Sequence, residues 1–292
     1  MSKTCVITGA TSGIGRAIAE GLASLQHTVI LLGRSPEKGA ALVEELKRDT
    51  RNNKVHYFNV DLCSQQQIRV VAEKILERFS TLDVLINNAA QWNSSLELTE
   101  DGIEKQFAVN HIAYFLLTHL LYPAIVNSNE GRIINIGSDS HRYGKMNFDN
   151  LNLEGKYHGL KAYGQAKLAN LLFSYELDRL KPDKQISVYC VQPGLVKTDI
   201  GIKHTNFLHS LAWKLRRLSG ITTEKAASNI IYLATSNEVA GRSGLYWDNR
   251  RSKPSSPASH NREHAQRLWK ISESMCGINN YFEETRKKQH SA

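Results

Sequence analysis

The sequence predicts an α/β fold, in which helices cover both faces of a doubly wound parallel sheet. Short apolar runs rich in β-branched residues suit strands that are buried on both faces, and amphipathic segments separate these runs. Alternation of this kind is typical of a doubly wound sheet. The apolar runs occupy residues 4–8, 28–32, 54–60, 82–87, 131–137 and 186–192.

Two of the segments between these runs have clear helical spacing. Apolar residues recur every three or four positions between the first two runs, and again between the third and the fourth. We therefore expect an amphipathic helix in each place. The apolar residues are Ile14, Ile18, Leu22 and Leu25 in the first segment and Ile68, Val71, Ile75 and Phe79 in the second.

The remainder of the chain indicates one domain with a C-terminal helical extension. A last strand-like piece, residues 243–247, is followed by a loop-like stretch, a helical pattern over residues 262–275 and a charged tail. We expect a single catalytic domain over residues 1–250, and a loop, helix and tail over residues 251–292.

Composition limits the class of protein. The 292 residues are 41% hydrophobic, enough to bury a core, and no apolar run approaches the ~20 residues of a membrane span. The chain enters a strand almost at once, which leaves no room for a signal peptide and predicts a cytoplasmic protein. The four cysteines are scattered without metal-ligand spacing, so we expect reduced thiols and no metal.

The formal net charge of +9 is compatible with three kinds of partner: nucleic acid, an anionic membrane or a phosphorylated cofactor. No long block of Lys and Arg is interleaved with aromatic residues, and no nucleic-acid-binding motif is present. We therefore expect no nucleic-acid partner.

A glycine-rich turn follows the first apolar run. The sequence TGATSGIG, residues 8–15, joins a predicted strand to a predicted helix. Such a turn presents backbone N–H groups and the positive end of a helix dipole to a phosphate, with no Cβ in the way. An ordinary tight turn is the alternative, since the spacing is GxxxGxG. The candidate phosphate-binding residues are Gly9, Thr11, Ser12, Gly13, Ile14 and Gly15.

The end of the second run indicates which dinucleotide is bound. NAD sites usually place an acidic residue here to bind the ribose hydroxyls, whereas an Arg accommodates a 2′-phosphate. This chain reads LLGRS, with Arg34 and no acid. NADP(H) is therefore favoured over NAD, the alternative being a solvated surface arginine.

The stretch KYHGLKAYGQAK contains two Tyr-x-x-x-Lys pairs, Tyr157 with Lys161 and Tyr163 with Lys167. One helical turn brings the ammonium close to the phenol, which lowers the tyrosine pKa from about 10 and allows acid–base chemistry. The first pair contains Gly159 and lacks apolar periodicity, whereas the second leads directly into a predicted helix. We therefore assign the chemistry to Tyr163 and Lys167.

Ser138 follows the fifth run, where a parallel strand ends and open α/β sheets place their ligands. Its hydroxyl can donate a hydrogen bond to a substrate oxygen on which charge develops. Ser140 is a competitor for this role. The residues between Ser138 and Tyr163 are expected to form a loop over the substrate, with Tyr143, Phe148 and Leu151 as candidate lining.

Several motifs in this order resemble those of the short-chain dehydrogenases/reductases. They are TGATSGIG, Asp61-Leu62, NNAA at 87–90, Asn110, Ser138, and Tyr163 with Lys167. The likeness is closer to the retinol-dehydrogenase-like branch, because of FAVNHIAYFLLT (107–118), RIINIGSDSH (132–141), KAYGQAKLANLLF (161–173) and AGRSGLYW (240–247). It covers residues 3 to about 275. The resemblance implies a Rossmann-type fold that binds a nicotinamide dinucleotide.

The resemblance also implies roles for single residues. Asp61 would bind the adenine edge, Leu62 would pack on the ring, and Asn87 and Ala89 would support the adenosine ribose and the neighbouring strand. Asn110 would hold a water that relays protons to Lys167. The nicotinamide side would be lined by Pro193, Gly194, Val196 and Thr198. Two positions depart from the family pattern: Ala90, where Gly is common, and Gly137, where a second Ser is frequent.

Residues 204–220 are expected to form an amphipathic lid over an apolar substrate site, with Phe207 and Leu211 as substrate-binding residues. An ordinary surface helix is the alternative. A further variant is that Trp213 and the basic side of the segment rest on an anionic membrane.

Together these patterns predict an NADP(H)-dependent oxidoreductase that interconverts a lipophilic, retinal-like carbonyl and its alcohol. Two alternatives stay open: an NAD-linked hydroxysteroid-type dehydrogenase, and a dinucleotide-binding regulatory or scaffold protein without turnover. Peripheral membrane contact and a homodimer are also open.

Overall fold

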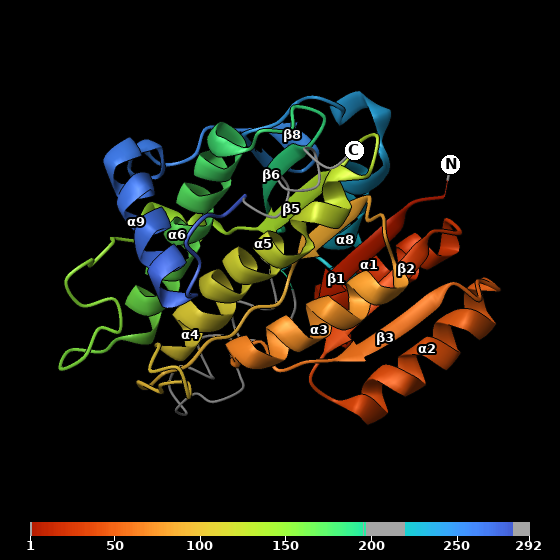
Figure 1. Ribbon diagram of the computed structural model, residues 1–292, viewed down its shortest axis with the longest axis horizontal. Helices are drawn as coiled ribbons and strands as arrows, with labels where there is room; N and C mark the ends of the chain where they lie inside the picture. The colour runs from red at the N-terminus through yellow and green to blue at the C-terminus, as the bar shows by residue number, and fades with distance from the viewer. Residues whose placement is uncertain (1, 195, 197–219, 283–292) are drawn as a thin grey trace.

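The computed structural model describes residues 2–194, 196 and 220–282. In this part of the chain, eight strands form one sheet in the order β3-β2-β1-β4-β5-β6-β7-β8 (Figure 1). Pairing is parallel from β3 to β7, and β8 adds antiparallel to the edge. The order reverses direction at β1, which makes the fold a Rossmann-type doubly wound sheet.

Every apolar run that predicted a strand is a strand in the structure. The bounds are β1 Thr4–Thr8, β2 Thr28–Gly33, β3 Val55–Asn59, β4 Val84–Asn87, β5 Arg132–Ile136, β6 Ser187–Gln192, β7 Leu245–Asp248 and β8 Arg251–Ser252. The two-residue β8 has no apolar pattern in the sequence and was not expected.

The described helices are α1 Gly13–Ser24, α2 Pro36–Thr50, α3 Gln65–Arg78, α4 Lys105–Phe107, α5 Ala113–Val126, α6 Gly159–Leu180, α8 Thr223–Thr235 and α9 Arg262–Met275. A π-helical turn, Ala108–Ile112, joins α4 to α5. Short 3-10 turns occupy Asp139–Arg142, Asn237–Val239 and Pro257–His260.

The sheet separates two apolar cores. On one face of the sheet, helices α3, α5, α6 and α9 pack against strand side chains such as Val6. On the other face, helices α1, α2 and α8 pack against strand side chains such as Cys5 and Ile7, the neighbours of Val6 in β1. Successive strand residues point to opposite faces, so continuous apolar runs supply both cores. Leu25 was expected on the buried face of the first helix and is instead 53% exposed, because α1 ends at Ser24.

The predicted C-terminal helix packs into the same core as the central helices. Helix α9 lies along α6 (Figure 1). Trp269 of α9 has its ring centre 5.1 Å from that of Phe115 in α5, and Tyr281, beyond the helix, lies 4.6 Å from Phe115. The protein is therefore one α/β domain whose C-terminal helical extension completes a core layer.

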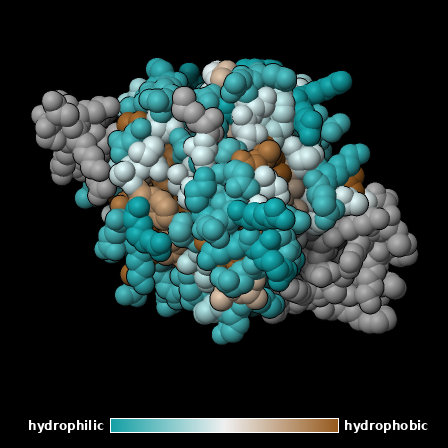
Figure 2. Space-filling model, turned by 90° about the vertical axis from the view of Figure 1, so that its right-hand side faces the viewer, coloured by the Kyte–Doolittle hydropathy of each residue, from teal (hydrophilic) through white to brown (hydrophobic). Residues whose placement is uncertain are grey.

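Contrary to the expectation that no apolar run approaches the length of a membrane span, one stretch of the described chain, Lys105–Val126, is long and apolar enough to cross a membrane. Of its most apolar window, 83% is buried inside the molecule, as expected of a core helix. Figure 2 shows a face on which hydrophilic residues dominate and apolar residues are scattered. Among the described residues, Tyr143 and Leu160 are exposed large apolar side chains that also border the cavity described next.

Candidate active site

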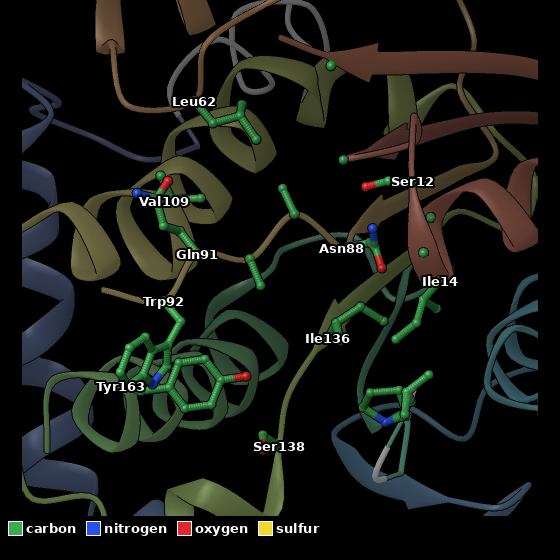
Figure 3. Close-up of a pocket in the computed structure, with 18 of the residues that line it drawn as sticks. Ser12, Ile14, Leu62, Asn88, Gln91, Trp92, Val109, Ile136, Ser138 and Tyr163 are labelled. Atoms are coloured by element: carbon green, nitrogen blue, oxygen red, sulfur yellow. The ribbon is translucent and has the colours of Figure 1, made fainter. Parts of the chain in front are cut away.

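A cavity of ≈ 550 Å³ opens at the carboxyl ends of the parallel strands (Figure 3). Most of the predicted site residues that the structure describes line it. They are Gly9, Thr11, Ser12, Gly13, Ile14, Gly15, Arg34, Asp61, Leu62, Ala89, Ser138, Tyr163, Lys167, Pro193, Gly194 and Val196. Thr198, Phe207, Leu211 and the proposed lid up to residue 219 lie outside the described residues.

The glycine-rich turn has the geometry of an anion cradle. Gly9 and Gly13 have positive φ angles of 65° and 55°, which other residues rarely adopt. A Cβ on Gly15 would lie 2.3 Å from the carbonyl oxygen of Gly9. The first turn of α1 contains no acidic residue, and Ser12 makes no side-chain capping bond to it. Its N–H groups are thus available to a phosphate, and the residues present fit a dinucleotide.

Two cations border the cavity at the end of β2. Arg34 is exposed there, and Lys38, in the first turn of α2, lines the same wall. Asp61 is the acidic residue among the described lining residues, and it lies after β3 instead of at the end of β2. Lys38 was not among the residues expected at this site, although its position four residues after Arg34 could have suggested it.

Asn87 does not line the cavity. It is fully buried, and its Nδ2 donates to Oδ1 of Asn135 at 2.9 Å and to Oγ1 of Thr118 at 3.0 Å. These contacts join β4 to β5 and α5, so they match the expected support of the neighbouring strand but not the ribose contact. Asn88 borders the cavity instead, and its Nδ2 donates to the carbonyl of Thr8 at 2.8 Å. The one-residue offset follows from the alternation of side chains along a strand.

Lys167 is buried below the cavity with 1% of its surface exposed. Its Nζ donates to the carbonyl of Ile136 at 2.8 Å and lies 5.7 Å from the centre of the Tyr163 ring. Burial lowers the pKa of Lys167 to about 8. The ammonium is therefore still the main form at neutral pH, and it lies on the same helix as the phenol that it influences.

Tyr163 and Ser138 reach the cavity from different elements. Tyr163 stands in the first turns of α6, and in Figure 3 its hydroxyl points into the cavity. Ser138 follows the end of β5, and its Oγ lies 3.1 Å from the Oγ of Ser140. Ser140 lines the same cavity, so the structure keeps it as a competitor.

Tyr157 and Lys161, the other Tyr-x-x-x-Lys pair, do not lie one turn apart on a helix. Helix α6 begins at Gly159, so Tyr157 precedes it, and Lys161 is exposed on its surface. The Tyr157 hydroxyl donates to Oε1 of buried Glu104 at 2.9 Å and accepts from Nε2 of Gln106 at 2.7 Å. Burial raises the pKa of Tyr157, the opposite of what acid–base work requires. Tyr157 anchors the preceding loop to the start of α4.

Asn110 is buried in the π-helical turn, and both polar atoms of its side-chain amide form hydrogen bonds with the backbone of Gln91. Its Oδ1 accepts from the backbone nitrogen of Gln91 at 2.7 Å, and its Nδ2 donates to the Gln91 carbonyl at 2.9 Å. Gln91 lines the cavity, so Asn110 shapes the wall through it. The proton relay to Lys167 stays a prediction.

The loop between Ser138 and Tyr163 only partly follows the expectation. Tyr143 lines the cavity and is 55% exposed. Phe148 and Leu151 were wrongly expected to line it. Leu151 is buried in the core, and the Phe148 ring packs against His264 of α9, because the loop folds back onto that helix. Trp92 and Leu160 line the cavity instead. Nothing in the sequence around these two residues had indicated that they would contact a substrate.

The structure explains one departure from the family pattern. A Cβ on Gly137 would lie 2.8 Å from Sγ of Cys190, so a serine does not fit this backbone. Ala90 lines the cavity beside Ala89. Within the described part of the chain, no group of three or more His, Cys, Asp or Glu residues could hold a metal ion.

Comparison with known proteins gives a consistent set of relatives. The model of the short chain dehydrogenase family matches residues 3–207. Human retinol dehydrogenase 13 is 38% identical over 283 residues, which cover 94% of this chain and 85% of that protein. Mouse retinol dehydrogenase 12 is 34% identical over 94% of this chain and 87% of its own length. The crystal structure of an uncharacterized protein from Mycobacterium Paratuberculosis superposes with a TM-score of 0.75 at 29% identity, covering 94% of each chain.

Proposed function

This chain belongs to the short chain dehydrogenase family and is retinol-dehydrogenase-like, and from that premise we propose that Ser138, Tyr163 and Lys167 carry out its chemistry with NADP(H). The family makes it an oxidoreductase that interconverts a carbonyl and an alcohol. The proposed substrate is a lipophilic, retinal-like aldehyde or ketone. The observation that carries the proposal is the convergence of these three side chains on one cavity that also contains the glycine cradle.

A bound nicotinamide supplies the hydride in the direction of carbonyl reduction. The Tyr163 hydroxyl then gives its proton to the substrate oxygen, while the Ser138 hydroxyl donates a hydrogen bond to the same oxygen. The Lys167 ammonium stabilises the resulting tyrosinate, since a nearby positive charge lowers a phenol pKa. The hydrogen bond from Lys167 to the Ile136 carbonyl keeps that charge in place. Oxidation of the alcohol uses the same groups in reverse.

Preference for NADP(H) is supported by the charges at the end of β2. Arg34 and Lys38 border the cavity where an NAD site usually carries an acidic residue. A guanidinium offers several donors to a phosphate and is always charged, so a 2′-phosphate would gain contacts that NAD lacks. This distribution favours an NADP(H) enzyme over the NAD-linked hydroxysteroid-type alternative.

A lipophilic substrate is supported by the cavity wall near Tyr163. Trp92, Tyr143 and Leu160 line the cavity with large side chains, and those of Tyr143 and Leu160 are exposed. Burying apolar substrate surface against them is favourable in proportion to the area removed from water. The similar proteins named retinol dehydrogenases point to the same substrate class. A regulatory protein without turnover would need neither this wall nor the buried lysine.

The two tyrosines of the repeated spacing provide the test. Tyr163→Phe should lower kcat by at least about 100-fold, because general acid–base catalysis contributes that much or more. NADPH binding should persist, since the glycine cradle and Arg34 are unchanged. Tyr157→Phe should retain most of the activity, because its hydroxyl binds Glu104 outside the cavity.

Both variants are assayed by NADPH oxidation with retinal, decanal and a small soluble ketone. Equal losses in the two variants would contradict the assignment to Tyr163. A wild type that turns over only the small ketone would contradict the lipophilic substrate class.

A further inference from the structure

His141 connects the turn after Ser138 to the C-terminal part of the chain. The imidazole is fully buried, its Nδ1 lies 2.6 Å from the carbonyl oxygen of Ser138, and its Nε2 lies 3.0 Å from the backbone nitrogen of Ser256. A carbonyl only accepts and a backbone N–H only donates, so the proton is on Nδ1 and the ring is neutral. Burial lowers the pKa of His141, which favours the same neutral form.

The same C-terminal segment contacts this turn at two further points. Arg142 Nη2 donates to the carbonyl of Pro254 at 2.7 Å, and Lys253 Nζ lies 3.0 Å from Oδ2 of Asp139. From the other side, Oε1 of Gln192 accepts from the backbone nitrogen of Asp139 at 2.7 Å. Residues 253–256 and the end of β6 thus both contact the turn.

The His141 ring acts directly on the peptide group of Ser138. The carbonyl of Ser138 accepts two hydrogen bonds, one from the backbone nitrogen of His141 at 3.1 Å and one from its ring. This carbonyl sets the ψ angle of Ser138, which is 149°. If it loses the ring donor, the backbone at Ser138 gains freedom just where the hydroxyl must meet a substrate oxygen.

We propose that His141 is a positioning residue for the reaction, which holds the Ser138 hydroxyl in the cavity by bracing the Ser138 carbonyl against residues 253–256. This inference rests on the role proposed for Ser138. It makes the C-terminal extension a part of the machinery that orients a catalytic group, although it contributes no side chain to the cavity in the described residues. Misplacement of a reacting group by ~1 Å can lower the rate by about 100-fold, so a small loss of order is measurable.

The test compares Ser138→Ala, His141→Phe and His141→Asn in the full chain with NADPH and retinal. Phenylalanine supplies an aromatic ring that can make neither hydrogen bond. Because the rate is sensitive to the position of a reacting group, kcat of this variant should fall at least about tenfold. The dissociation constant for NADPH and the KM for retinal should stay near the wild-type values. Asn carries an amide donor close to the place of Nδ1 and should recover part of the lost kcat.

His260→Asn is the matched control. Its imidazole belongs to the same C-terminal segment, but its Nε2 bonds to Oγ of Ser255 at 2.9 Å instead of the Ser138 turn. Its kcat should equal that of the wild type. A stability measurement by urea unfolding accompanies every variant, because a merely structural role would lower stability without lowering kcat at temperatures where the protein is folded.

The outcomes separate the inference from the proposed function. If Ser138→Ala keeps full kcat, the proposed chemistry fails, and the positioning role fails with it. If Ser138→Ala loses activity but His141→Phe keeps its kcat, or His141→Asn is no better than His141→Phe, only the positioning role is overturned. Should His141→Phe not fold, His141→Gln replaces it. Gln carries its amide farther out, towards Ser256, so a kcat equal to or above that of the Asn variant overturns the inference.

Discussion

Replacing Lys167 with methionine should stabilise the cofactor-free protein at neutral pH while removing its activity. Burial lowers the pKa of Lys167 from 10.5 to about 8. Each unit of pKa corresponds to about 1.4 kcal/mol, so carrying the buried ammonium destabilises the folded state by about 3 kcal/mol. Methionine fills similar space without the charge. The Ile136 carbonyl loses its bond to the charged Nζ, which offsets at least about 1.5 kcal/mol and leaves a net gain of at most about 2 kcal/mol.

The gain should depend on pH in a defined direction. Between pH 8 and 10.5 the unfolded chain still holds the Lys167 proton while the folded protein releases it. Stability rises with pH wherever the unfolded state binds more protons, so the wild type becomes more stable across this window. The methionine variant lacks that contribution. The stability advantage of the methionine variant should therefore be complete below pH 8. At about pH 9.5 the solution is only about one pH unit below the unfolded-state pKa of 10.5, so less than half of the advantage should remain.

Urea unfolding of the cofactor-free proteins at pH 7 and pH 9.5, followed by tryptophan fluorescence, measures both effects. Lys161→Met is the matched control, because Lys161 lies on the same helix, in the other Tyr-x-x-x-Lys pair, but is exposed. It should change neither stability nor kcat appreciably. A Lys167→Met variant that is less stable than the wild type at pH 7, or whose advantage does not shrink with pH, would refute the reasoning.

Two further predictions concern Arg34 at the end of β2 and the backbone beside Ser138. Arg34→Ala should weaken NADPH binding about tenfold or more, since a hydrogen bond to a charged group contributes about 1.5–3 kcal/mol, and should leave NADH binding unchanged; fluorescence titration with both cofactors checks this, and a wild type that prefers NADH would contradict it. Gly137→Ser should destabilise the protein by about 1–3 kcal/mol as an overpacked core substitution, because its Cβ would meet Cys190; urea unfolding of this variant and of its combination with Cys190→Ala, which should recover part of the loss, measures the effect.

Features that depend on one element and its immediate neighbours were predictable from the sequence. The apolar runs indicated every parallel strand, because a strand buried on both faces needs apolar residues on both. The choice between the two tyrosine–lysine pairs also depended on local information, since Gly159 marks the start of α6, which leaves Tyr157 outside the helix but contains both Tyr163 and Lys167. The glycine-rich turn was predictable because only glycine allows its positive φ angles and its close backbone approaches.

Features that depend on packing between distant segments were not predictable. Phe148 and Leu151 looked like substrate lining, but Leu151 is buried in the core and the half-buried Phe148 packs against His264 of α9. The offset between Asn87 and Asn88 required knowing which face of β4 each side chain occupies.

The succession of strands and helices along the chain, the glycine-rich turn and the helix that carries Tyr163 could all be predicted from the amino-acid sequence. What surrounds them could be seen only in the folded domain. The bond between His141 and Ser256 spans 115 positions along the chain, and no periodicity or motif connects the two residues. Periodicity shows that a face will be buried, but the element that buries it is decided by the packing of the whole domain.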